Sequence, residues 1–199
     1  MKTLLHLALG LTALLTAVSG LRADSKSIGY FETIQKEAAP VVGEQYYMRH
    51  CLRYEAGKPW ETTNYWTDSS IFVPINSKVT LNSLASHSMQ IKIEKTGQVL
   101  TIENVQKYSQ REMAEIAKNM LTRTAVPIEK FDEKDAKNIR NGILTLGMTK
   151  EQVVMTRGYP PGHKTPSLEV DSWTYWNNRF GTHLLIFQDG VLIKGRGLY

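Results

Sequence analysis

The hydrophobic and polar positions around residue 150 follow a helical pattern with clear ends. Thr149 and Gln152 have the spacing of a capping box, in which each side chain bonds a free backbone N–H of the first turn. Gly158 can end a helix, and Pro160 prevents its continuation. The pattern therefore predicts a helix over about residues 150–157.

Strand-like runs follow this helix after an irregular loop. Residues 159–166 contain three prolines and a glycine, which excludes regular structure. Residues 172–177 then alternate with period two, and residues 184–187 form an apolar run. Asp189-Gly190 is a preferred pair for a type I′ turn, and it leads into apolar residues 191–193. We predict a three-stranded antiparallel meander.

The region before residue 106 is rich in short strand-like runs. These runs are 45–54, 62–67, 70–74, 78–84, 87–94 and 100–105. Met89, Ile91 and Ile93 face one side of their strand, which is typical of a half-buried position in a sheet, and Lys95–Gln98 suits a hairpin loop. Short strands at this density favour a small barrel.

Three further helices are predicted, together with the division of the chain. Residues 24–38 have an approximate helical spacing, Ser109 and Glu112 form a second capping box for a helix to about residue 122, and Asp132 caps a helix that ends at Asn141-Gly142.

We expect a signal peptide over 1–23, an N-terminal segment with a short helix over 24–44, a β-rich domain with a trailing helix over 45–124, and a C-terminal domain over 125–199. The fold class is α+β.

The first 23 residues have the features of a secretory signal peptide. Lys2 supplies a positive start, an apolar run follows, and Leu21-Arg22-Ala23 ends in a small residue at the expected cleavage site, with cleavage after Gly20 as the alternative. A lipoprotein would need a cysteine where Leu21 stands, so we expect a periplasmic protein without a lipid anchor. Cleavage removes two positive charges and no acid, which lowers the net charge from +5 to +3. No later apolar stretch is long enough to span a bilayer.

Candidate catalytic and metal-binding residues are few. Cys51 is the only cysteine, which excludes an internal disulfide. Neighbouring residues of a strand point to opposite faces, so His50 is poorly placed to serve Cys51 as a base. The histidines lack the close pairs typical of a zinc site, and no phosphate-binding loop is found. We expect a buried free thiol, with a reactive or intermolecularly paired thiol as the alternatives, and neither a cofactor nor a metal.

The aromatic residues of the last third suggest a surface for a partner. Trp173 and Tyr175 share one face of their strand, so Trp176 lies on the other face and is partly exposed if the sheet packs on one side. Exposed aromatic residues beside arginine suit protein or glycan contacts. The candidate partner-binding residues are Tyr159, Pro160, Pro161, Trp176 and Arg179, with packing against the first part as the alternative.

Motifs of the last quarter of the chain resemble a known family. They are the GMTKEQV start at 147–153, the Gly158-Tyr159-Pro160 stop, the Asp171-x-Trp173-x-Tyr175 strand and the Phe187-x-Asp189-Gly190-x-Leu192 hairpin. Together they look like the SmpA/OmlA (BamE-like) outer-membrane-assembly lipoproteins, whose helix-plus-meander unit recurs in β-lactamase inhibitor proteins. The stretch from Val73 to Val79 resembles bacterial SH3-like domains. The resemblance implies an SH3-like β-barrel followed by two helices and a three-stranded meander. The missing lipoprotein cysteine departs from the family and puts membrane attachment in doubt.

These observations favour an exported, non-enzymatic binding or envelope-assembly module. Its expected partner is another envelope protein, with outer-membrane-assembly machinery or peptidoglycan as candidates. The alternatives are a cell-wall enzyme that uses Cys51, a subunit that targets such an enzyme, and an inhibitor of a secreted enzyme. Export and the mild charge disfavour a nucleic-acid partner.

Overall fold

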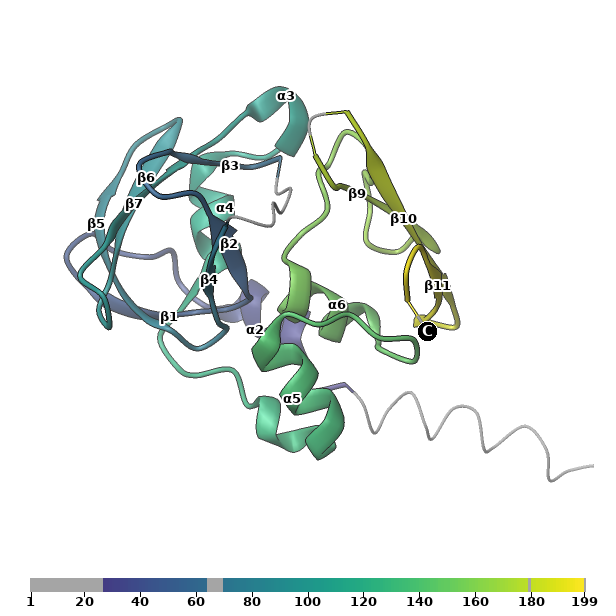
Figure 1. The fold of residues 1–199 in the computed structure, drawn as a ribbon. Coiled ribbons are helices and arrows are strands. Elements are labelled where there is room, and N and C mark those ends of the chain that lie inside the picture. Colours follow the sequence, from purple (N-terminus) through teal and green to yellow (C-terminus); the bar gives the residue numbers. More distant parts are fainter. Residues whose placement is uncertain (1–26, 64–69, 179, 199) are drawn as a thin grey trace, which may run out of the picture.

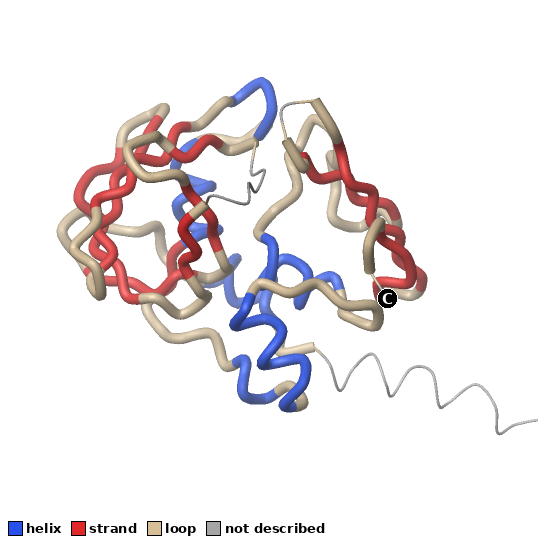
Figure 2. Tube along the Cα trace, viewed as in Figure 1, coloured by secondary structure: helices blue, strands red, loops and turns tan. Residues whose placement is uncertain are grey.

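The computed structural model describes residues 27–63, 70–178 and 180–198. The predicted signal peptide, Arg179 and most of the strand predicted at 62–67 lie outside these ranges. The molecule is a mixed α+β structure in which a curled sheet stands beside a unit of helices and a second sheet (Figures 1 and 2). The α+β class predicted from the sequence is confirmed.

The larger sheet has six strands and curls into a half-barrel (Figure 1). Its order is β3 (Trp60–Glu61), β7 (Val99–Glu103), β6 (Ser88–Ile93), β5 (Lys78–Leu84), β1 (Gln45–Met48) and β8 (Leu121–Thr122). The β3–β7 pair is parallel and the other pairs are antiparallel. The alternation predicted in β6 is confirmed, because Met89, Ile91 and Ile93 are all buried. A separate two-stranded sheet contains β2 (Leu52–Tyr54) and β4 (Ile71–Val73).

The single strand-like run predicted over 45–54 is wrong, because the chain leaves the sheet at residues 49–51. The Arg49 N–H still donates to the carbonyl of Met120 (2.8 Å), next to the Met48–Leu121 pair, but the Cys51 N–H donates to the carbonyl of Met155 (2.9 Å), outside the sheet. These bonds mark the end of β1 and separate it from β2. They also place His50 and Cys51 where the half-barrel meets the rest of the molecule.

The second predicted capping box is also wrong. Ser109 ends a short helix, α3 (Gln106–Ser109), and Gln110 follows with a φ of 55°. The Ser109 hydroxyl donates to Oδ1 of Asn104 (2.6 Å) and accepts the N–H of Arg111 (3.3 Å), a residue that precedes the next helix. That helix, α4 (Met113–Met120), begins after Glu112 without a side-chain cap.

The helices before the meander form as their caps predict. After a 3₁₀ turn, η1 (Ile128–Lys130), the Asp132 side chain accepts the N–H of Asp135 at the start of α5 (Glu133–Asn141), and Gly142 ends it with a φ of 67°. The Thr149–Gln152 capping box is present at the start of α6 (Lys150–Arg157). Both helices have the predicted bounds.

The predicted meander is confirmed as β9 (Ser172–Trp176), β10 (Thr182–Gln188) and β11 (Val191–Gly195) in the order β11-β10-β9. Asp189 and Gly190 both have positive φ values, 50° and 75°, as a type I′ turn requires. Trp173, Tyr175, Leu185 and Phe187 point from this sheet into a shared core with α6. Figure 1 shows the sheet standing on the far side of α6 from the half-barrel.

The first described helix, α2 (Tyr30–Lys36), packs on the C-terminal unit. Its start has no side-chain cap of its own. The buried carboxylate of Glu151 in α6 accepts instead from the Ser27 hydroxyl (3.1 Å) and from the N–H groups of Ile28 and Tyr30 (3.0 Å each). Tyr30 and Ile34 are consequently buried in the same core as Trp173. The helix predicted over 24–38 is present, but it is shorter.

Candidate functional site

The loop after α6 is held against the half-barrel by a close backbone approach. A Cβ atom on Gly162 would lie 2.3 Å from the carbonyl oxygen of Ser109, so this position admits only glycine at the present spacing. The next N–H, that of His163, donates to the carbonyl of Tyr108 (3.0 Å). Pro160 and Pro161 are buried. Three residues of the sequence-predicted partner surface, Tyr159, Pro160 and Pro161, therefore lie at the junction of the two parts.

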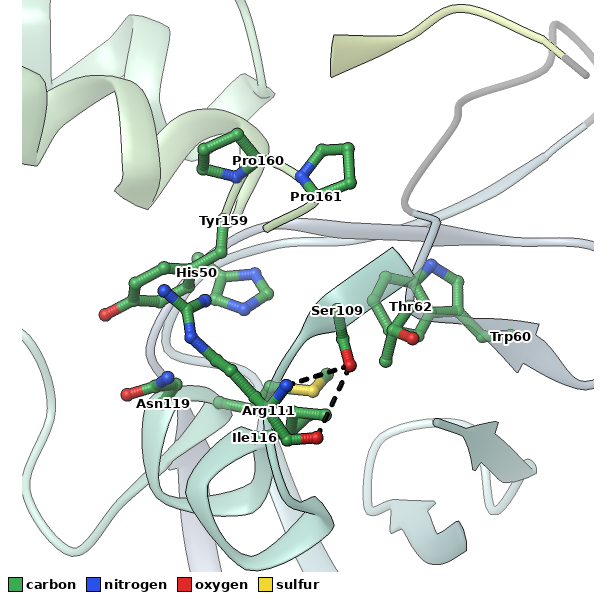
Figure 3. A pocket seen from close by; sticks show the side chains of 11 residues that line it. His50, Trp60, Thr62, Ser109, Arg111, Ile116, Asn119, Tyr159, Pro160 and Pro161 are labelled. Atoms are coloured by element: carbon green, nitrogen blue, oxygen red, sulfur yellow. Dashed lines mark hydrogen bonds between the residues drawn. The ribbon is translucent and has the colours of Figure 1, made fainter. Parts of the chain in front are cut away.

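A small pocket lies under this loop (Figure 3). It has a volume of about 40 Å³, which is room for about three water molecules. His50 comes from the break between β1 and β2, Trp60 from β3, Arg111 from the segment between α3 and α4, and Tyr159 from the loop. The junction pocket, as we call it, thus takes walls from both parts of the chain.

Electrostatics in the junction pocket favour a neutral histidine beside a cation. Burial lowers the pKa of His50 to about 4. Its Nδ1 lies 2.9 Å from the carbonyl oxygen of Cys51, which can only accept, so Nδ1 carries the hydrogen and Nε2 is left as an acceptor. The Arg111 guanidinium lies 5.1 Å from the centre of the Tyr159 ring and forms a salt bridge to Glu115 (2.9 Å).

Cys51 is a buried free thiol, as predicted. Its Sγ donates to the carbonyl of Ile139 (3.1 Å) and accepts the N–H of Ile75 (3.3 Å), so that it joins α5 to the segment after β4. Burial raises the pKa of the thiol to about 12, which keeps it protonated at neutral pH. The contacts describe a packing residue.

Trp176 lies on the outer face of the meander, away from the core. Trp173 and Tyr175 are fully buried, whereas Trp176 is half-buried. Its ring stacks on His163 with the ring centres 6.0 Å apart, and the Lys164 ammonium lies 5.6 Å from the centre of the Trp176 ring. The structure thereby links Trp176 to the loop that carries Tyr159. Arg179, the fifth predicted residue, is outside the described ranges.

The meander and its first connection also carry exposed apolar side chains that were not predicted from the sequence. Phe180, between β9 and β10, is 88% exposed, Leu184 in β10 is 49% exposed and Ile193 in β11 is 47% exposed. Leu184 pairs with Thr174, next to the Thr182–Trp176 pair, so Leu184 and Trp176 are diagonal neighbours on one face. We call Trp176, Phe180, Leu184 and Ile193 the meander patch. The apolar run 184–187 contained part of this signal, because residues 184 and 186 must face away from residues 185 and 187.

Metal and membrane signals are absent from the part of the chain that the structure describes. Within residues 27–63, 70–178 and 180–198, no three His, Cys, Asp or Glu side chains are grouped so that they could hold a metal ion. Over those same ranges no helix has both the length and the apolar character needed to cross a bilayer.

Comparisons with known proteins found no relative of this chain. No family model matches it, and neither a curated protein nor a solved structure is significantly similar.

Proposed function

We propose that this protein is an exported, non-enzymatic binding or envelope-assembly module that contacts another envelope protein through the meander patch. The observation that carries the proposal is the exposure of Leu184 and Ile193 in strands of the meander and of Phe180 in the connection between β9 and β10. Scattered apolar residues are common on protein surfaces, but neighbouring ones on a rigid sheet are typical of protein-binding sites.

The meander gives these side chains a firm support. Trp173 and Phe187 pack in the core with their ring centres 4.6 Å apart, and the Trp173 indole donates to the carbonyl of Val170 (3.1 Å). The outer side chains are therefore held in place before any partner arrives, which reduces the entropy lost on binding.

Both units are also proposed to belong to known architectures. The capped α6, its partner α5 and the meander support an SmpA/OmlA (BamE-like) C-terminal domain, and the curled sheet supports an SH3-like N-terminal domain. Function still follows from sites and not from folds, so the meander patch carries more weight in the proposal. An enzyme acting through Cys51 receives little support, because that thiol is buried and protonated.

Site-specific photo-crosslinking tests the proposal. A benzoyl-phenylalanine placed at position 180 or 184 in the producing cell should give one discrete crosslinked product, because both side chains face outward. Val99 is the matched control, since it is an apolar residue of the half-barrel with 43% exposure. The same product from position 99, or no product from 180 and 184, would contradict a binding role for the meander patch.

Cell fractionation tests the location separately. A C-terminally tagged chain should be recovered from the periplasm with its first 20 to 23 residues removed, as mass spectrometry can measure. Full-length precursor in the cytoplasm, or incorporation of a labelled fatty acid, would contradict the proposed export without a lipid anchor.

A further inference from the structure

The strands of the meander carry no acidic residue. Neither Asp nor Glu occurs in β9, β10 or β11, or in the connection between β9 and β10. The nearest acids in the sequence are Asp171, which precedes β9 and pairs with Lys150 (3.4 Å), and Asp189 in the turn between β10 and β11. The strands themselves therefore supply no negative charge to the outer face of the sheet.

A cation lies next to the apolar side chains of that face. Leu185 and Phe187 point into the core, so Ile186 between them faces outward. Lys194 pairs with Ile186, and the register shift after this pair leaves Ile193 as an extra residue beside Lys194. Lys194 is exposed. Its charge is therefore adjacent to one member of the meander patch.

Two more cations lie close to the sheet. Lys164 is exposed, and its ammonium is 5.6 Å from the centre of the Trp176 ring. Arg196 is exposed just after β11. Burial lowers the pKa of His183 in β10, and the charges of Arg157 and Arg196 lower it further. Within the described ranges, no salt bridge neutralises Lys164, Arg196 or the lysine of β11. The meander patch is thus bordered by positive charge.

The packing of Trp176 favours a protein over a lipid bilayer as the partner of this face. The Trp176 ring lies nearly parallel to the ring of His163, at 21°, and is held against the loop. A side chain that anchors a protein in a bilayer has to project into the boundary of the acyl chains. An apolar centre with a charged border is instead the usual arrangement of a protein–protein interface.

We propose that the partner of the meander patch presents an acidic protein surface. Its apolar side chains cover Trp176 and Leu184, and carboxylates at their border pair with Lys164 and Lys194. This inference rests on the proposed function and adds the chemistry of the partner. Charges at the border of an interface act mainly on the rate of association and on the choice of partner. An acidic surface is therefore selected over a neutral or basic one that offers the same apolar contacts.

Photo-crosslinking combined with charge reversal tests this proposal. Benzoyl-phenylalanine at position 184 is the probe in the producing cell, in the parent chain and in chains that also carry Lys164→Glu or Lys194→Glu. Each reversal should lower the yield of the crosslinked product at least about fivefold, because a like-charge contact replaces an ion pair. Lys194→Arg keeps the charge and should keep the product.

A matched control separates the border of the patch from the net charge of the protein. Lys95→Glu reverses an exposed lysine in the connection between β6 and β7 and should leave the yield unchanged. Equal urea midpoints of the parent chain and the variants will show that the fold is retained.

The outcomes separate this inference from the proposed function. Mass spectrometry of the product should find Asp or Glu close to the captured residue of the partner. If the product forms equally well, or better, with the reversed charges, the acidic partner is overturned and the binding role of the meander patch stands. A phospholipid adduct in place of a protein, or no product from the parent chain, would overturn both.

Discussion

The two hydrophobic cores of this molecule are assembled in different ways. The described members of the half-barrel core all come from one stretch, residues 46–121. The second core combines the C-terminal unit with Tyr30, Ile34, Cys51 and Ile75 from far earlier in the chain. The half-barrel thus contains its own core, whereas the C-terminal unit shares its core with α2, which precedes the half-barrel, and with Cys51 and Ile75, which lie between strands of the half-barrel. The second core therefore includes residues from both sides of the boundary predicted near residue 125.

The largest expected effect comes from Trp173→Ala, which removes a fully buried ring from the second core. We expect a loss of about 3–5 kcal/mol in the free energy of unfolding. Hydrogen exchange should show lost protection in α6 and β9–β11 and retained protection in β5, β6 and β7. Equal loss of protection in both regions would mean that the two cores unfold as one unit.

The second-largest expected effect concerns the hydrogen bonds that hold the start of α2 on α6. Glu151→Gln removes the charge that accepts three hydrogen bonds from residues 27–30, and should cost about 2 kcal/mol. Urea denaturation measures this loss, and limited proteolysis should become faster within residues 27–36. Glu169→Gln changes an exposed carboxylate in the same way and serves as the control. If the two variants were equally stable, the N-terminal segment would not belong to the second core.

A loss of stability of similar size is expected when the pH is lowered, because His50 is buried in the junction pocket. Burial lowers the pKa of His50 from 6.5 to about 4, so between these values the unfolded chain binds the proton and the folded chain does not. Stability therefore falls as the pH decreases through this window, by about 2 kcal/mol between pH 7 and pH 5. The comparison is with His50→Asn, whose urea midpoint should fall less over the same range. If the urea midpoints of the two proteins fell equally over this pH range, His50 would not be buried in its neutral form.

The smallest effect separates the two predicted capping boxes. Thr149→Ala loses a real cap and should cost about 1 kcal/mol. Glu112→Ala, at a helix start without a side-chain cap, should change stability by less than about 0.5 kcal/mol, as surface substitutions do. Thermal denaturation of both variants measures the difference. An equal loss at Glu112 would show that the second box forms in solution.

These two boxes show what the sequence could predict. The bounds of α5 and α6 were predicted because their caps are local: Thr149 bonds Gln152, and Asp132 bonds Asp135. The motif at Ser109 looks the same in the sequence, but Ser109 ends α3, and its hydroxyl donates to Asn104 and accepts the N–H of Arg111. A sequence motif indicates which hydrogen bonds a side chain can make, and contacts with other parts of the chain determine which of them form.

The candidate sites were harder to predict, because they depend on contacts between distant residues. Trp176 was placed on the outer face by alternation alone, and its exposure relative to Trp173 is confirmed. Pro160 and Pro161 could not be placed, because their burial depends on the approach of Gly162 to Ser109. The junction pocket combines residues 50, 60, 111 and 159, which no local pattern connects.

The bond between Glu151 and Tyr30 also sets an order of folding. These residues are separated by 121 positions, so α2 cannot dock until the chain beyond residue 151 is available. The half-barrel needs no such delay, since its core ends at residue 121. In a chain that emerges from its N-terminus, whether from the ribosome or through a membrane, residues 27–36 must therefore wait undocked while the half-barrel folds.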